Sequence, residues 1–153
     1  MYETPVKARV LCRDIMTKSV KTATRADSLQ TVARLMRDGD MGSVPVVEDG
    51  KLVGIVTDRD LVVRSIADGK DASTSIAEAM TTDIFSVKPD DFAFEAIRLM
   101  GDKQVRRIPV VDDEGRLAGI IAMADIALEM EDQQEIAETL EEISSGSGFW
   151  SKK

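Results

Sequence analysis

Two aspartates occupy matching places in this chain, each a few residues beyond the start of an apolar run. Asp60 ends the segment GIVTDRD, residues 54–60, and Asp125 ends the segment GIIAMAD, residues 119–125. An ionised aspartate only accepts hydrogen bonds, so it suits a ligand that offers two adjacent hydroxyl groups. The chemistry open to each aspartate is to accept hydrogen bonds from the hydroxyl groups of a ligand.

The first of these aspartates also fits an arrangement that needs no ligand. Thr57 and Asp60 have the spacing of a capping box, in which the threonine caps a helix and the acid accepts a hydrogen bond from the threonine's own N–H group. The second segment has Ala122 in place of the threonine but keeps Asp125. Because alanine has no hydroxyl with which to cap, we favour a ligand role for Asp125 and, by duplication, for Asp60. An acid in the first turn nevertheless stabilises a helix on its own account.

The two segments belong to a duplicated unit. Residues 14–49 align with residues 78–113 at an offset of 64 positions, and one inserted residue, Glu114, raises the offset to 65. Repetition at a fixed period predicts two copies of one supersecondary block that bury their apolar faces together. Such a pair offers two related clefts, and the missing hydroxyl at position 122 predicts that the two clefts are not equivalent.

Each copy is predicted to run in the order strand, helix, strand, strand, helix. In the first copy, Asp27 is the expected N-cap of the first helix and Gly39 its end. Pro45 lacks an N–H group, which favours an edge or first position in its strand. The expected elements are 19–23, 28–37, 44–47, 52–56 and 58–68 in the first copy, and 84–87, 92–100, 108–111, 117–121 and 124–130 in the second.

The predicted domain organisation follows the repeat. The segments are a lead-in, 1–13, a first domain, 14–68, a linker, 69–74, a second domain, 75–130, and a C-terminal segment, 131–153. The C-terminal segment contains an expected acidic helix at 133–143, followed by a tail that is flexible by composition. The narrow apolar stripe of that helix predicts packing on its own body or on a second subunit.

The composition narrows the classes of function. The 153 residues carry a net charge of −8, which disfavours binding to a nucleic-acid backbone. No segment approaches the ~20 apolar residues of a membrane helix. With no histidine and a single cysteine, Cys12, the chain has neither a disulfide pair nor a ligand set for zinc. The single cysteine fits a reducing compartment, so we expect a cytoplasmic protein. The lack of histidine and of a Gly-x-x-x-x-Gly-Lys phosphate loop predicts that it is not an enzyme.

On these motifs the chain resembles a tandem pair of CBS domains, the unit called a Bateman module. The segments VPVV, residues 44–47, and IPVV, residues 108–111, precede the two aspartate segments at constant spacing, and the resemblance covers 14–130. The resemblance implies an α/β (mixed α+β) fold of two units packed with pseudo-twofold symmetry. It also implies a stand-alone two-CBS protein of the prokaryotic type.

The resemblance further implies an adenosine-containing ligand in the cleft between the halves, with no cofactor required. AMP, ADP, ATP, S-adenosylmethionine, NAD and cyclic dinucleotides are the candidates. In the family pattern the aspartate accepts hydrogen bonds from the ribose, and the threonine faces the phosphate or the ribose. Main-chain groups at the start of the second strand of each copy contact adenine. Basic residues just before that strand contact a phosphate. The expected ligand residues are Thr57, Asp60, Asp125, Arg107, Arg106, Thr22, Val44 and Ile108.

Two of these residues have an equally good alternative. Arg106 could be a solvated surface charge, whereas a guanidinium suits a phosphate through its planar fork of donors. The hydroxyl of Thr22 could simply serve a turn. The site prediction therefore depends most on the two aspartates.

The leading hypothesis is a non-catalytic sensor whose ligand changes how the halves, or two subunits of a homodimer, pack. A protein partner that reads this change is expected but not identified by the sequence. The alternatives are a protein-interaction module with degenerate ligand sites and a divalent-cation sensor. The acidic excess suggests the latter, although no compact Asp/Glu cluster has the spacing of a calcium-binding loop.

Overall fold

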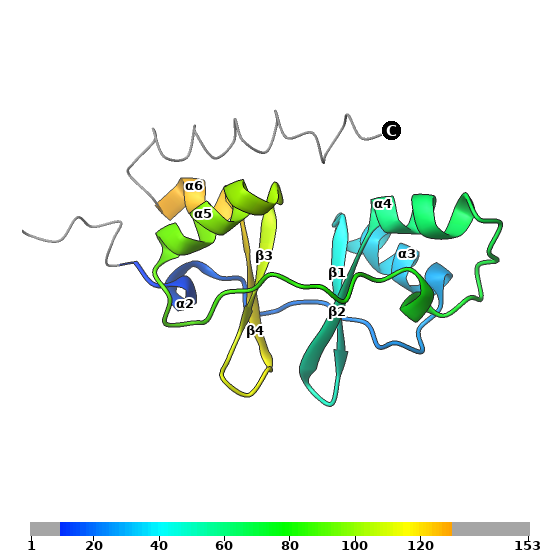
Figure 1. Ribbon diagram of the computed structural model, residues 1–153, viewed down its shortest axis with the longest axis horizontal. Helices are drawn as coiled ribbons and strands as arrows, with labels where there is room; N and C mark the ends of the chain where they lie inside the picture. The colour runs from blue at the N-terminus through cyan, green and yellow to red at the C-terminus, as the bar shows by residue number, and fades with distance from the viewer. Residues whose placement is uncertain (1–9, 130–153) are drawn as a thin grey trace, which may run out of the picture. The chain divides into compact units, whose positions relative to one another are not determined.

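The computed structural model describes residues 10–129. The expected helix at 133–143 and the tail lie outside these residues. Figure 1 shows the order of the elements along the chain. The helices are α2 (Cys12–Ile15), α3 (Leu29–Gly39), α4 (Asp58–Leu61), α5 (Ala93–Lys103) and α6 (Met123–Glu129), with a π-helical segment, η1 (Val62–Ile66), and a 3-10 turn, η2 (Ile76–Glu78). The strands are β1 (Ser43–Glu48), β2 (Lys51–Thr57), β3 (Arg107–Val111) and β4 (Leu117–Ala122).

The chain forms two compact units, each built mainly from one repeat. The first-repeat unit comprises Val20–Ile84 with Glu114–Leu117, and the second-repeat unit comprises residues 10–19, Phe85–Asp113 and 118–129. Each unit contains a two-stranded sheet, β1 with β2 or β3 with β4, followed directly by a helix. The predicted duplication and the mixed α/β class are confirmed.

The compact units are divided differently from the predicted domains because of two matching segments, 10–17 and 74–81, which we call the lead-ins. Each lead-in packs in the unit that is built mainly from the other repeat. The helix α2, which precedes the first repeat, contacts α5 and α6 of the second-repeat unit. The turn η2, which precedes the second repeat, belongs to the core of the first-repeat unit through Ile76. The repeat in the sequence shows that these two segments match each other but does not show which unit each of them completes.

Two matching bridges hold the lead-ins in place. Thr17 exchanges main-chain hydrogen bonds with Ile120 of β4 at 2.8 and 3.0 Å. Thr81 does the same with Ile55 of β2, at 2.8 and 2.9 Å. The approach is close because the neighbouring strand residues are Gly54 and Gly119. A Cβ added to Gly119 would lie 2.7 Å from the Thr17 carbonyl oxygen.

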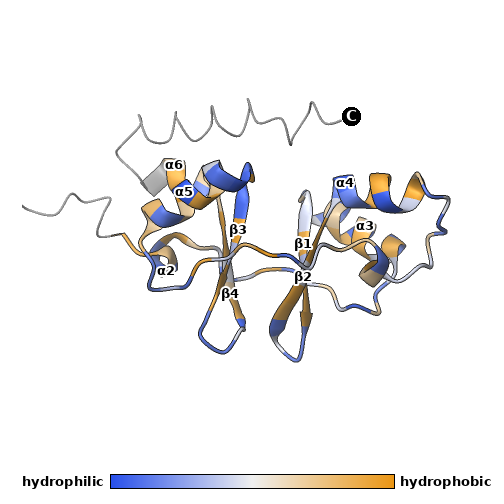
Figure 2. Cartoon of the chain, in the orientation of Figure 1, coloured by the Kyte–Doolittle hydropathy of each residue, from blue (hydrophilic) through white to orange (hydrophobic). Residues whose placement is uncertain are grey.

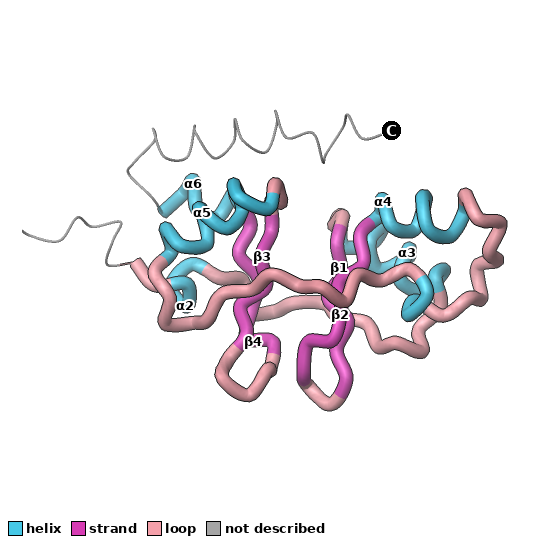
Figure 3. Tube along the Cα trace, viewed as in Figure 1, coloured by secondary structure: helices cyan, strands magenta, loops and turns pink. Residues whose placement is uncertain are grey.

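The predicted first strands of both copies do not form as strands. In the segment 19–23 only Ala23 makes a bridge, with Val46, and in the segment 84–87 only Val87 does, with Val110. Figure 3 draws both segments mainly as loop. Each segment bridges its sheet at one residue, Ala23 beside β1 and Val87 beside β3, so neither segment extends its sheet as a third strand.

The remaining elements lie close to their predicted positions. Helix α3 begins one residue later than expected, because Ser28 rather than Asp27 is its N-cap and accepts a hydrogen bond from the Thr31 N–H group at 3.1 Å. The Asp27 carboxylate instead accepts the Thr24 N–H bond at 2.9 Å, which closes the preceding turn. Gly39 is the last helical residue, and Asp40 adopts the left-handed C-cap conformation with φ 50°.

Each unit has its own apolar core, and the two cores use corresponding positions. Figure 2 shows hydrophobic residues along the strands and hydrophilic ones at the hairpin turns. Cys12 is fully buried in the second-repeat core, at the place that Ile76 takes in the first-repeat core. Burial, together with the nearby carboxylates of Asp91 and Glu95, raises the pKa of the Cys12 thiol to about 12. This thiol is therefore an apolar core group.

Candidate functional site

The first strand–helix junction, the turn from β2 into α4, places Thr57 and Asp60 against each other. The Asp60 N–H group donates to Thr57 Oγ1 at 3.0 Å, and the Thr57 N–H group donates to Asp60 Oδ2 at 2.9 Å. This is the complete capping box that the sequence offered as the alternative to a ligand role. The Asp60 side chain is only 15% exposed, and its Oδ1 lies 3.8 Å from Arg64 Nε.

The second strand–helix junction, from β4 into α6, keeps half of this arrangement. The Ala122 N–H group donates to Asp125 Oδ2 at 3.1 Å, the counterpart of the bond from Thr57 to Asp60. The missing hydroxyl at position 122 therefore does not deprive Asp125 of a local role, and the argument that Ala122 points Asp125 towards a ligand loses its force. Both aspartates hold their junction closed through one oxygen.

One junction bond leaves an aspartate with spare acceptor capacity. A carboxylate has two oxygens and about four acceptor positions, and the junction uses one of them. At Asp60 the second oxygen faces a long ion pair to Arg64, which a stronger donor can displace. The geometry is compatible with a carboxylate that shapes the turn and accepts hydrogen bonds from a ligand at the same time.

The start of each hairpin is tied to the helix that follows it. The Asp58 N–H group donates to the Gly42 carbonyl at 2.9 Å, and the Met123 N–H group donates to the Arg106 carbonyl at the same distance. Ser43 pairs with Thr57 across the first sheet. The residues just before β1 and β3 therefore lie beside the first residues of α4 and α6, so their side chains border the junctions.

Val44 and Ile108 were expected to offer main-chain contacts to adenine, but both are fully buried. Val44 pairs with Val56 in the antiparallel ladder. The N–H and C=O groups of Ile55, the residue before Val56, point the other way and bond to Thr81. Because antiparallel pairs alternate between bonded and non-bonded, the N–H and C=O groups of Val44 face β2. Ile108 repeats this position in the second sheet. The polar main-chain groups of both residues are therefore directed into their own sheets, and their side chains are apolar.

The other predicted site residues lie nearer the surface. Arg106 and Arg107 are both exposed, and Arg107 is the first residue of β3. Thr22 is half-buried and precedes Ala23, which forms a parallel bridge with Val46 of β1. Thr22 thus lies next to the residue that meets the first sheet.

Asp58 is a residue of the first junction that the sequence reasoning missed. Its carboxylate lies against Gly42, so that a Cβ added to that glycine would sit 3.4 Å from Asp58 Oδ2. The corresponding residues of the second junction are Met123 and Arg106. A position-by-position comparison of the two copies would have found this difference, because it replaces an acid and a glycine with an apolar residue and a base.

Comparison with known proteins gives the family. The family model described as the CBS domain matches residues 12–66 and 76–132. The chain belongs to the CBS-domain family. These two CBS repeats are 37% identical over 132 residues to the CBS domain-containing protein YhcV of Bacillus subtilis, covering 86% of this chain and 94% of YhcV. They are 41% identical over 136 residues to the uncharacterized protein YlbB of the same species, covering 88% and 91%.

Solved structures of CBS pairs match the fold and carry ligands of their own. The CBS domain pair of protein MJ0100, in complex with 5′-methylthioadenosine and S-adenosyl-L-methionine, is 29% identical with a TM-score of 0.69, covering 78% of this chain and 94% of that one. CBSX2 in complex with AMP is 25% identical with a TM-score of 0.71 and the same coverage. Hypoxic Response Protein I with two coordinated zinc ions is 35% identical with a TM-score of 0.73, covering 79% and 99%.

The described residues do not contain a metal-ligand group that would correspond to the zinc sites of that last structure. Across residues 10–129, no group of three or more His, Cys, Asp or Glu side chains is arranged to hold a metal ion. The sequence contains no histidine, and Cys12 is buried. Among the helices of the described part, none is both long and apolar enough to span a bilayer.

Proposed function

We propose that this CBS pair is a non-catalytic sensor that binds an adenosine-containing ligand through Asp60 and Asp125. The candidate ligands are AMP, ADP, ATP, S-adenosylmethionine, NAD and cyclic dinucleotides. The observation that carries the proposal is the repeated geometry of the two aspartates. Each aspartate accepts one main-chain hydrogen bond at its own junction through one oxygen. Its remaining acceptor positions can bind the two hydroxyl groups of a ribose. The adenosyl ligands of two related structures support this choice of ligand class.

The capping role and the ligand role can be separated by choice of substitution. In Asp60→Asn the amide oxygen still accepts the Thr57 N–H bond, but an NH2 group replaces the second oxygen and can only donate. In Thr57→Ala the cap is lost while the carboxylate remains. If Asp60 binds ribose, the first variant loses ligand affinity with little change in stability, whereas the second loses the stability that the cap contributes.

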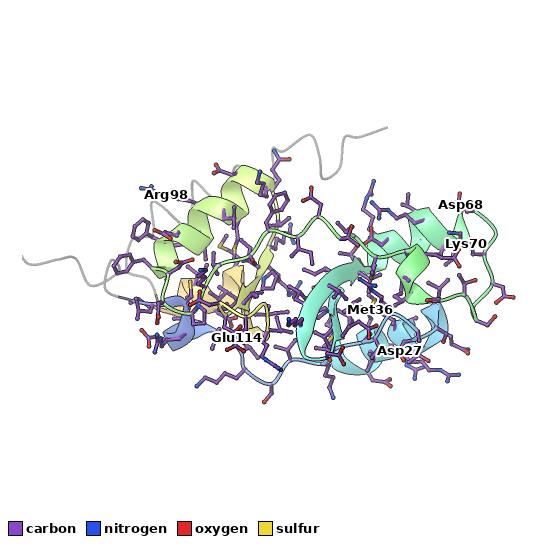
Figure 4. The ribbon with its side chains drawn as sticks, turned by 60° about the horizontal axis from the view of Figure 1, so that its bottom comes forward. Asp27, Met36, Asp68, Lys70, Arg98 and Glu114 are labelled. Atoms are coloured by element: carbon purple, nitrogen blue, oxygen red, sulfur yellow. The ribbon has the colours of Figure 1, made fainter. Side chains whose placement is uncertain are left out.

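The measurement is a thermal-shift panel of the candidate ligands, followed by calorimetric titration of those that respond. Saturation at 100 times the dissociation constant adds about 2.7 kcal/mol of stability. We expect a response in the wild type that Asp60→Asn and Asp125→Asn each reduce. Asp68→Asn, an equal change of charge at an exposed residue shown in Figure 4, is the control and should leave the response intact. A response unchanged in both site variants would refute the assignment.

The alternative functions give different results in the same panel. A protein-interaction module with degenerate sites would show no thermal shift with any adenosine compound. A divalent-cation sensor would respond to calcium or magnesium without nucleotide, but the described residues offer no three-ligand group for such an ion. The panel should therefore include both cations, with a chelator as the reference.

We also propose that the active form is a homodimer in which a second copy covers the outer face of α4 and η1. Val62, Val63 and Ile66 are 54%, 48% and 69% exposed, although they are large apolar residues within five positions of one helix. Asp58 and Arg59 flank this face with charges of both signs, which can pair with each other where the same surface of two copies meets. Light scattering after size exclusion should report a dimer for the wild type and for Ala72→Glu. A dimer that survives Ile66→Glu would exclude this face.

A further inference from the structure

The start of helix α5 carries exposed aromatic rings where the start of α3 is polar. Phe92 is 42% exposed and stacks on Phe94, with 5.8 Å between the ring centroids. The guanidinium of Arg98, one turn further along the helix (Figure 4), lies 5.1 Å from the centroid of the Phe94 ring. The positions of the two rings are taken by Ser28 and Gln30 in the first repeat. We call Phe92, Phe94 and Arg98 the aromatic face of α5.

In the first repeat, the chain at the beginning of the lead-in crosses the start of α3. The Thr74 carbonyl accepts the Leu29 N–H bond at 2.9 Å, and the Ala72 carbonyl accepts the Gln30 N–H bond at 3.1 Å. These main-chain acceptors add to the cap that the Ser28 side chain supplies. Because the first N–H groups of a helix have no partner within the helix, a segment that offers carbonyls there is held in place.

The second repeat reproduces the first of these two bonds. The Val10 carbonyl accepts the Ala93 N–H bond at 2.8 Å, which is the counterpart of the bond between Leu29 and Thr74. Phe92 supplies no side-chain cap to α5, so this helix depends on main-chain acceptors for its first N–H groups. The described part of the chain begins at Val10, beside this helix start, and nine residues precede it.

We propose that the N-terminal segment, residues 2–8, docks on the aromatic face of α5, and that the Ala8 carbonyl accepts the Phe94 N–H bond. The pairing follows from the repeat. Ala8 and Phe94 stand 64 positions from Ala72 and Gln30, which form this bond in the first repeat. The occupant of the aromatic face is thus the chain itself, and the docking requires neither a ligand nor a second copy.

The N-terminal segment has the length and the side chains that this surface requires. An extended chain advances about 3.3 Å per residue, so the segment spans about 20 Å, whereas α5, with 11 residues, is about 16 Å long. Its apolar residues are Tyr2, Pro5 and Val6, which can cover exposed rings, and Glu3 offers an acid to the guanidinium of Arg98. Removing ring surface from water favours the docked state.

Amide hydrogen exchange measured by NMR on the full chain tests the predicted bond. The Phe94 amide should exchange at least tenfold more slowly than an unstructured amide, as should the Gln30 amide, whose acceptor is described. A variant that lacks residues 2–8 should lose this protection at Phe94 and keep it at Gln30 and at the buried Met100 of α5, which report that both units are folded. A Phe94 amide that is unprotected in the wild type, or unaffected by the deletion, overturns the proposal.

Limited proteolysis tests the surface. Trypsin cuts after Lys7, within the N-terminal segment, and docking should slow this cut. The double variant Phe92→Ala with Phe94→Gln should speed it at least fivefold. Phe85→Ala is the matched control, because this ring is 39% exposed and lies beside Lys103 at the other end of α5. The control should cleave at the wild-type rate.

A second copy of the chain is the competing occupant of the aromatic face. Light scattering after size exclusion on the same variants distinguishes the two occupants. If the ring variant cleaves faster at Lys7 and its molar mass is that of the wild type, the N-terminal segment covers the face. If the ring variant dissociates a dimer and cleaves at the wild-type rate, the face is an interface between copies and the proposal is wrong.

Discussion

Replacing Gly119 with alanine tests the crossing of the first lead-in over β4. The added Cβ would lie 2.7 Å from the Thr17 carbonyl oxygen and 2.8 Å from Met16 Sδ. The Thr17 carbonyl cannot move alone, because it accepts the Ile120 N–H bond at 3.0 Å in the bridge that holds the lead-in. To relieve the contact, the main chain has to shift and that bridge has to lengthen.

The expected loss of stability follows from two opposing effects. Overpacking of this kind costs about 1–3 kcal/mol, and alanine recovers about 0.4–1 kcal/mol by restricting the unfolded chain. The net expectation for Gly119→Ala is a loss of about 1.3 kcal/mol in the free energy of unfolding. For a chain of this size that corresponds to a fall of about 4 °C in the melting temperature.

The duplication supplies a matched control in Gly54→Ala. There the nearest atom is Met80 Sδ at 2.7 Å, near the end of a flexible side chain, and the nearest main-chain atom is the Thr81 oxygen at 3.2 Å. Most of this contact can relax, so we expect a loss below about 1 kcal/mol. Urea unfolding at equilibrium measures both variants. The reasoning is wrong if Gly119→Ala is as stable as the wild type or if Gly54→Ala is the more destabilised of the two.

Three further predictions concern the caps and the buried thiol. Thr57→Ala should lower the free energy of unfolding by about 1 kcal/mol through loss of the cap. Ala122→Thr should raise it by about 0.5–1 kcal/mol by completing the second capping box. Urea unfolding measures both variants, and an unchanged midpoint in each would show that these caps contribute nothing to stability. Because the pKa of Cys12 is about 12 in the folded protein against 9.0 as its ordinary value, the unfolded chain loses this proton first. Stability should therefore fall between pH 9 and 12 by up to about 1.4 kcal/mol per pH unit, and Cys12→Val should flatten that slope in unfolding curves recorded across the pH range.

Most of the elements and the placement of the two aspartates could be predicted from local sequence patterns. The apolar spacing in 28–37 and 92–100 predicts α3 and α5 to within a few residues, and the runs around Pro45 and Gly54 predict the first hairpin. The alignment of the copies placed Asp60 and Asp125 at equivalent junctions, and both accept the corresponding main-chain bond. These features depend on neighbours in the chain, so the sequence alone specifies them.

The tertiary structure decided the features that depend on residues far apart in the chain. Long-range packing decides which unit α2 and η2 complete. It also decides that the segments 19–23 and 84–87 bridge their sheets at one residue each, and no local periodicity encodes either feature. The same packing buries Cys12 in the position of an apolar residue. It also brings the Asp58 carboxylate against Gly42, across a hairpin, a contact that neither motif displays by itself.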